Sequence, residues 1–204
     1  MISTLYFAYH KFRFRVYRKL CGYISRFYFF VSNVQYDKFI TIGLPLLEIS
    51  PTGIFRLGSG VSMVSSARYA TLGKNNRCKF VVADNARLII GNNVGMSNTT
   101  IVATLTVEIG NNVLLGGGVV IVDSDFHSLN PRHWHTTDDL NYMKKRPVII
   151  KDNVFIGMDS KILKGVTIGY NSVIAAGSVV SKNVPDNEIW GGNPAKFVKA
   201  NTLK

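Results

Sequence analysis

Between Ile150 and Val184, apolar side chains recur with a period of six residues. The first repeated position is aliphatic in six successive hexads: Ile150, Ile156, Ile162, Ile168, Ile174 and Val180. The position four residues later is small or β-branched each time: Val154, Ser160, Val166, Ser172, Ser178 and Val184. A short period kept over this many repeats predicts a solenoid.

The spacing of the two repeated positions predicts how the chain folds. The fourth-place residue of one hexad and the aliphatic residue of the next are two apart, so both point to the same side of a strand and into a core. The residues after the aliphatic position must turn a corner, which favours Gly, Ala and Asn. Three hexads then close one triangular coil of about 18 residues, and stacked coils pair their strands in parallel. The predicted fold is an all-β solenoid, a parallel β-helix.

Earlier in the chain the hexads are less regular. Two groups continue the aliphatic positions, namely Ile109, Leu115 and Ile121, and before them Ile90, Met96 and Val102. Glu108 marks a slip of one residue, and residues 57–89 show only fragments of the pattern. Residues 127–149 interrupt the hexads. We expect this block to protrude as a loop, because a solenoid can release a loop at a corner without disturbing the stack.

The N-terminal segment differs from the rest in charge and composition. The chain of 204 residues has a net charge of +12, and half of it lies in residues 1–36, which hold six basic side chains and no acidic one. Aromatic residues are interleaved with these charges, and we expect a helical segment. It either caps the open end of the solenoid or contacts an anionic membrane surface. Nucleic acid also fits the charge, but no binding motif supports it.

Cysteine content and hydropathy indicate in which cellular compartment the protein is expected. Cys21 and Cys78 cannot build a disulfide framework and lack the paired spacing of a zinc site. Arg26 interrupts Leu20–Val34, the most apolar stretch, and no cleavable signal is apparent. We expect a cytoplasmic protein, with a peripheral position on the inner face of the cytoplasmic membrane if residues 1–36 contact lipid.

Three features together resemble a known family. They are the hexads, the ending Gly191–Lys196 (GGNPAK) and the loop motif Asp123–Ser128 (DSDFHS). Over about residues 88–200 the chain resembles the left-handed parallel β-helix acyltransferases. The nearest subgroup contains the maltose, galactoside and surface-polysaccharide O-acetyltransferases. The resemblance implies acetyl-coenzyme A as co-substrate and a homotrimer, with each active site closed by a neighbouring subunit. It divides the chain into an N-terminal segment (1–40), a β-helix domain (41–190) and a coenzyme A-binding tail (191–204).

Histidine is the residue best suited to the proton transfer that such chemistry requires. Acyl transfer to a hydroxyl needs a base that works near neutral pH, and histidine has a reference pKa of about 6.5. His127 follows a complete hexad and matches the family's catalytic histidine. Asp123 and Asp125 flank it and are expected to hold its other ring nitrogen; alternatively, each caps a turn.

The resemblance also carries binding roles onto particular positions. It implies coenzyme A contacts at Gly157, Met158, Ala176, Ser181 and Lys182, and phosphate contacts at Lys196 and Lys199. The alternative for the lysines is an ordinary solvated side chain.

The acceptor contacts are expected at Asn98, His133 and Trp134. One residue is missing near Asn98 relative to the family pattern, so Ser97 is an alternative to it. The pair His133 and His135 could suggest a metal, but it lies in a polar loop and no third histidine follows on the hexads. No metal is expected.

The function that these features favour is acetyl-coenzyme A-dependent O-acetylation of a sugar hydroxyl, on a bacterial surface polysaccharide or its lipid-linked precursor. His127 would act as general base, with direct transfer and no acyl-enzyme. Two alternatives stay open: N-acetylation of a nucleotide-linked amino sugar, and a catalytically idle β-helix that serves as a scaffold.

Overall fold

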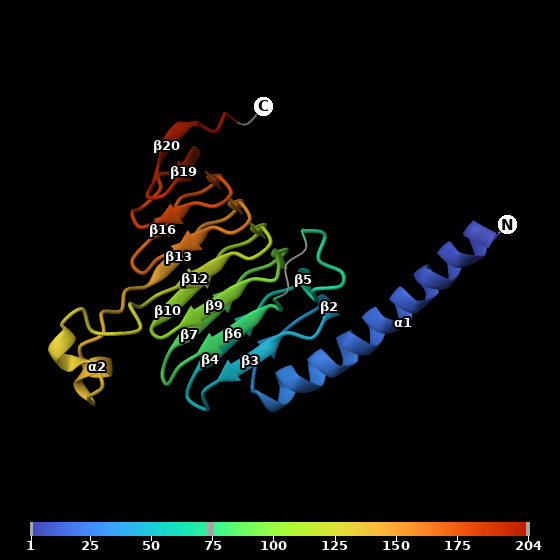
Figure 1. The fold of residues 1–204 in the computed structure, drawn as a ribbon, viewed down its shortest axis with the longest axis horizontal. Helices are drawn as coiled ribbons and strands as arrows, with labels where there is room; N and C mark the ends of the chain where they lie inside the picture. The colour runs from blue at the N-terminus through green and yellow to red at the C-terminus, as the bar shows by residue number, and fades with distance from the viewer. Residues whose placement is uncertain (1, 73–75, 203–204) are drawn as a thin grey trace.

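The computed structural model describes residues 2–72 and 76–202 of the chain. They form a stack of triangular coils, with a long helix, α1 (Ile2–Val31), leading away from one end (Figure 1). Six coils follow one another along the described residues, and each coil contributes one strand to each of three sheets. The corners between the first and second, second and third, and third and first sheets are called the first, second and third corner.

Neighbouring strands in the stack are parallel, as the hexads predict, except in the last hairpin. The first sheet holds β1 (Gln35–Tyr36), β4 (Ile54–Leu57), β7 (Arg87–Ile90), β10 (Thr106–Ile109), β13 (Val148–Ile150) and β16 (Thr167–Ile168). The second holds β2 (Phe39–Gly43), β5 (Val61–Ser65), β8 (Gly95–Ser97), β11 (Leu114–Leu115), β14 (Phe155–Ile156), β17 (Val173–Ile174) and the antiparallel pair β19 (Glu188–Gly192) and β20 (Ala195–Ala200). The third holds β3 (Leu46–Ile49), β6 (Lys79–Val82), β9 (Thr100–Ala103), β12 (Val120–Val122), β15 (Lys161–Ile162) and β18 (Val179–Val180).

The core runs along the axis of the stack and consists of the repeated positions. All six aliphatic residues from Ile150 to Val180 are buried, and so are the six residues that lie four places after them. Three of these are serines whose hydroxyls donate to corner carbonyls: Ser160 and Ser178 to Ala175, and Ser172 to Pro185. The buried hydroxyls are therefore satisfied, and small polar residues are tolerated in the core.

One part of the predicted register is wrong. Ile101, not Val102, is the inward aliphatic residue of its strand, and it pairs with Ile121 in the next coil. Ile101 follows Met96 by five positions, because the second corner is one residue shorter at Asn98. Two extra residues, Thr104 and Leu105, then lengthen the third corner. The slip of one residue that we placed at Glu108 is the sum of these two changes. The shortening by one residue reverses which side chains of β9 point inward.

Asparagines line the first corner in a continuous row. They have positive φ angles between 55° and 61°, a region that asparagine tolerates better than most residues. Their side-chain amides are hydrogen-bonded from coil to coil at 2.9–3.2 Å, in the order Asn93, Asn112, Asn153, Asn171 and Asn187. This row explains the Gly-Asn-Asn sequences at the corners.

A long loop leaves the stack at the third corner of the fourth coil (Figure 1). It runs from residue 123, after β12, to residue 147, before β13, and so begins four residues earlier than the predicted block. Residues 123–147 are called the excursion. It contains a 3₁₀ turn, η1 (Pro131–His133), and a short helix, α2 (Asp138–Asn141). Two backbone hydrogen bonds close its base, from Asp125 to Lys144 and from Arg146 to Asp123.

The C-terminal part of α1 covers the first coil. Phe29 is fully buried and its ring stacks on Phe39 of β2, with centroids 4.9 Å apart. Cys21 and Ser25, on the same face of the helix, are also buried. The last turns of α1 therefore cover the first coil, and farther along the helix Phe14 and Tyr17 pack on Tyr69, in the segment between β5 and β6. The coils begin at Gln35, before the boundary at 41 that we expected.

Candidate active site

His127 lies where the chain leaves the stack. It follows Phe126, which has a φ of 63°, a left-handed conformation that is strained for a bulky residue. This turn carries the chain away from the third corner and into the excursion. The side chain of His127 is 70% exposed. The ring is therefore accessible to a substrate on the rim of the fourth coil.

Asp139 holds the ring of His127. The Nδ1 atom of His127 lies 2.7 Å from Oδ2 of Asp139, and Oδ1 of Asp139 accepts the backbone N–H of Ser128 at 2.7 Å. Hydrogen bonds from the His127 ring and from the Ser128 amide lower the pKa of Asp139. The carboxylate is therefore ionised at neutral pH and accepts a hydrogen bond from Nδ1–H of His127. This arrangement leaves Nε2 as the atom with a lone pair for a substrate proton.

Asp123 does not contact His127, and the prediction that it orients the ring is wrong. Its carboxylate is buried and accepts three backbone N–H groups, from Thr104, Leu105 and Thr106, at 2.7–2.8 Å. The hydroxyl of Thr104 donates a fourth hydrogen bond at 2.8 Å. These donors belong to the third corner of the coil below, which has two extra residues. Asp123 therefore satisfies the backbone of an irregular corner.

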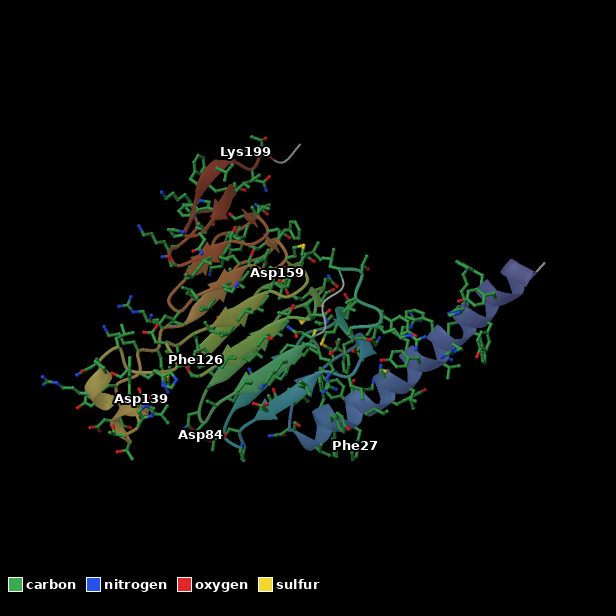
Figure 2. The ribbon with its side chains drawn as sticks, viewed as in Figure 1. Phe27, Asp84, Phe126, Asp139, Asp159 and Lys199 are labelled. Atoms are coloured by element: carbon green, nitrogen blue, oxygen red, sulfur yellow. The ribbon has the colours of Figure 1, made fainter. Side chains whose placement is uncertain are left out.

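Asp125 has a different partner as well. Its carboxylate forms an ion pair with Lys164, which lies at the third corner of the next coil. The pair joins the base of the excursion to the stack, so the expectation that Asp125 orients His127 is also wrong. Asp139 was missed because it lies 12 residues beyond His127 and is brought back only by the fold of the excursion (Figure 2).

A hollow of about 310 Å³ opens beside His127, lined also by Trp134, His135 and Asp139. The indole N–H of Trp134 donates to the carbonyl of Ser128 at 2.7 Å, which fixes a ring that is about half exposed. The predicted acceptor residue Trp134 therefore lies at the site. His135 lies there too, although we did not predict a role for it.

His133, predicted to contact the acceptor, instead packs within the excursion. Its Nδ1 lies 2.9 Å from Oγ of Ser128, and its ring stacks on Tyr142 with centroids 4.5 Å apart. His133 thus supports the loop that carries Trp134. Among the described residues, no group of three or more His, Cys, Asp or Glu side chains is arranged to hold a metal ion.

The predicted coenzyme A residues fall at three places. Gly157, Met158 and Ala176 lie along the second corner, where the amide of Gly177 donates to the carbonyl of Met158 at 2.8 Å. A Cβ atom on Gly157 would lie 2.5 Å from the backbone nitrogen of Ala176, so only glycine permits this stacking. This run of corner residues, 157–158 and 176–177, is called the ridge.

The predicted lysines lie elsewhere. Ser181 and Lys182 follow β18 at the third corner. Lys196 and Lys199 are exposed on β20, in the hairpin at the far end of the stack from α1, where Figure 2 labels Lys199. Three cationic side chains are thus exposed near the last coils.

Asn98 lies at the second corner, two coils before the ridge. It is buried, with a φ of 50°, and its side-chain amide donates to the carbonyl of Asn76. Ser97, the alternative to Asn98, lines a hollow beside it together with Gly116 and Gly117. Asn98 and the ridge therefore share one corner, whereas His127 lies at another.

A family model described as "Bacterial transferase hexapeptide (six repeats)" matches residues 147–182, which contain the fifth and sixth coils. A galactoside O-acetyltransferase of Escherichia coli (strain K12) is 37% identical over 134 residues, covering 64% of this chain and 64% of that protein. The chain spans less than two thirds of the length of the curated relatives it matches.

Solved structures share the fold. A galactoside acetyltransferase in complex with coenzyme A superposes with a TM-score of 0.56 at 30% identity, over 71% of this chain and 65% of that one. AntD, an N-acyltransferase from Bacillus cereus in complex with dTDP and coenzyme A, gives a TM-score of 0.63 at 17% identity, over 83% of this chain and 84% of that one. At that identity the second match supports the fold alone.

The predicted fold class, a left-handed parallel β-helix of hexapeptide repeats, is confirmed by these matches together with the three parallel sheets. The predicted resemblance to the galactoside O-acetyltransferases is confirmed as well. Residues 147–182 are therefore similar to the hexapeptide repeats of bacterial transferases, and the similarity to a galactoside O-acetyltransferase extends over 134 residues.

Proposed function

We propose that this chain is an acetyl-coenzyme A-dependent O-acetyltransferase that acts on a sugar hydroxyl of a bacterial surface polysaccharide or of its lipid-linked precursor. The observation that carries the proposal is the contact between His127 and Asp139 at the mouth of the hollow. A fixed, exposed imidazole beside an aromatic face is suited to a sugar, since a sugar ring packs on an aromatic plane and its hydroxyl needs a base. The similarity to galactoside O-acetyltransferases supports the same chemistry.

The roles of the residues follow from their positions. Nε2 of His127 takes the proton of the acceptor hydroxyl as its oxygen attacks, and the ionised Asp139 stabilises the imidazolium that forms. His127 then returns the proton to the departing thiolate. Neither step needs a covalent intermediate on the protein. Trp134 provides the apolar face against which the sugar is held.

The ridge and the lysines fit coenzyme A, which supplies the acetyl group as a reactive thioester. A Cβ atom on Gly177 would meet no atom within 4 Å, so the missing side chain there leaves room for an extended pantetheine arm against the backbone of the second corner. Lys182, Lys196 and Lys199 lie near the last coils, where their charges would meet the phosphates of the nucleotide.

A homotrimer is part of the proposal. His127 lies at the third corner and the ridge at the second corner of the same triangular stack, so one chain presents the two halves of the site on separate edges. In a ring of three prisms, the third corner of one copy can face the second corner of its neighbour. We further propose a cytoplasmic location, with peripheral contact of residues 1–36 with the inner face of the cytoplasmic membrane.

The test measures free thiol released from acetyl-coenzyme A in the presence of soluble glycan acceptors. His127→Ala should lower kcat by about 10²- to 10⁴-fold, the usual contribution of a general base. His10→Ala, on the exposed part of α1, is the matched control and should retain the wild-type rate. A retained rate in His127→Ala would refute the proposal. A product that resists mild alkali would show an amide, and hence N-acetylation.

A further inference from the structure

The side of α1 that faces away from the coils carries a continuous apolar stripe. Its members are spaced three or four residues apart and therefore share one face of the helix. Each is between 50% and 76% exposed: Tyr9, Phe12, Val16, Leu20, Tyr23, Phe27 and Phe30. These seven residues are called the outer stripe.

The cap does not cover the outer stripe. The face of α1 that packs on the first coil holds Cys21, Ser25 and Phe29, which are buried. At 100° per residue, the outer stripe lies on the opposite side of the helix from these three. Figure 2 places Phe27 on the side of α1 away from the coils. Folding of the single chain therefore leaves the stripe in contact with water.

Basic side chains border the stripe. The charged residues of α1 are all positive: Lys11, Arg13, Arg15, Arg18, Lys19 and Arg26. Arg15, Lys19 and Arg26 form a row along one side of the stripe, by the same helical geometry. Arg18, Lys19 and Arg26 also line a hollow of about 170 Å³ between α1 and β2, together with Phe39 and Ile40.

These charges distinguish two possible partners of the outer stripe, a second copy of α1 and an anionic membrane surface. A second copy of α1 would bring six positive charges against six others, with no acidic side chain on either helix to balance them. An anionic bilayer surface supplies both an apolar layer for the stripe and phosphate groups for the bordering cations. Within the described residues, no helix is long and apolar enough to cross a membrane. The helix is therefore suited to lie along a membrane surface.

We propose that α1 lies on an anionic phospholipid bilayer, with the outer stripe inserted among the acyl chains and Arg15 and Lys19 at the level of the headgroup phosphates. This assignment deepens the proposed peripheral contact of residues 1–36 and rests on it, because it names the helix face and the lipid chemistry. The last turns of α1 are fixed to the first coil through Phe29, so the whole stack would be held at the surface in one orientation.

The experiment is co-sedimentation of the full chain with vesicles. Wild-type protein should bind vesicles of 30% phosphatidylglycerol in phosphatidylcholine and should not bind pure phosphatidylcholine vesicles. The variant Phe12→Ser/Leu20→Ser/Phe27→Ser should bind the anionic vesicles at least ~10-fold more weakly, because it removes apolar area from the stripe. Arg15→Gln/Lys19→Gln should weaken binding as well, and should lower its dependence on salt.

The matched control replaces three exposed apolar residues of the coils, Ile54→Ser/Leu72→Ser/Leu105→Ser, and should bind as wild type does. Wild-type binding by the stripe variant, or no binding of wild type to anionic vesicles, would overturn the proposal. So would a smaller assembly of the stripe variant in sedimentation without lipid, which would assign the stripe to a second copy.

Activity on a soluble acceptor separates this proposal from the proposed function. Without vesicles, the stripe variant should release thiol at the wild-type rate, whereas His127→Ala should not release it. His127→Ala should bind anionic vesicles as tightly as wild type. Lipid binding without any acetyl transfer would support the membrane-binding surface and refute the enzymatic proposal. Acetyl transfer without lipid binding would support the enzymatic proposal and refute the membrane-binding surface.

Discussion

At His127, one carboxylate determines which ring nitrogen is available as a base. Asp139 accepts a hydrogen bond from Nδ1–H, so Nε2 is the ring nitrogen left without a proton. Without the carboxylate, the other tautomer is allowed and the imidazolium loses its partner. In the proposed mechanism, Asp139 therefore acts through His127.

Asp139→Asn should lower kcat by at least ~10²-fold and leave KM for the acceptor within about twofold, since the two side chains have the same shape and the change removes only the charge that supports the base. Steady-state kinetics would measure both constants. Asp138→Asn, one residue earlier and exposed, is the control and should behave as wild type. The double variant His127→Ala/Asp139→Asn should be no slower than His127→Ala alone. A further loss in the double variant would mean that Asp139 acts independently of His127.

The burial of Cys78 leads to a prediction about how the free energy of unfolding changes at alkaline pH. Its thiol is buried, and burial raises its pKa to about 11. Because the folded pKa is above that of the unfolded chain, about 9, the stabilising contribution is complete below pH 9 and is lost as the pH rises to 11. The loss is about 2 to 3 kcal/mol over that range.

Thermal unfolding from pH 8 to 11 would measure this contribution. Cys78→Ala should have a shallower fall in Tm over that interval than wild type, and the titration of other groups cancels in the comparison. Parallel curves for the two proteins would contradict the assignment to Cys78.

At the scale of the element, α1 has two halves with different roles. The last turns pack on the first coil, and the remainder extends beyond it (Figure 1). The stability of the coils should therefore depend on the buried face of α1 and not on its exposed face.

Phe29→Ala should lower the free energy of unfolding by about 3 to 5 kcal/mol, the usual cost of emptying a buried aromatic site. Phe27→Ala, two residues away and 61% exposed, is the matched control and should change it by no more than about 0.5 kcal/mol. Urea denaturation followed by circular dichroism would measure both. Equal losses in the free energy of unfolding for the two variants would contradict the role of Phe29 in covering the first coil.

The strands were predictable where the hexads are regular, because a period of six determines which residues of each strand point into the core. In the third coil only β9 was predicted in the wrong register, because Asn98 shortens the corner before it and Thr104 and Leu105 lengthen the corner after it. The longer corner is held by Asp123, which belongs to the following coil. The residues of the third coil alone therefore do not show that its longer corner is stabilised.

The candidate site was predictable to a similar degree. His127 and Trp134 were found from a motif and from residue type, and both lie at the hollow. Asp139 and His135 were missed, because the excursion has no period from which its fold could be deduced. Its shape depends on hydrogen bonds between positions far apart in sequence, such as those that Asp139 makes to His127 and Ser128.

At the scale of the whole molecule, the separation of His127 from the ridge makes a prediction about mixed assemblies. His127→Ala removes the base, and Ala176→Trp blocks the ridge with a side chain placed on an exposed residue. Each variant alone should be inactive. Co-expression at equal levels should restore about one quarter of the wild-type activity, because a site shared between neighbours is intact when each contributes its unaltered half.

Thiol release from the purified mixture would measure the restored activity, and sedimentation would report the size of the assembly. Co-expression of His127→Ala with Asp139→Asn is the control, since both changes affect the same half-site and no intact site can form. An inactive mixture of His127→Ala and Ala176→Trp would contradict a site shared between chains.

The two ends of the coil stack also limit how the molecule can grow. Each coil offers its backbone hydrogen-bonding groups to the next, so an uncovered end would be a template on which another molecule could polymerise. The last turns of α1 cover one end, and at the other β20 runs antiparallel to β19 and breaks the parallel register. Loss of either cover should therefore favour end-to-end growth into filaments.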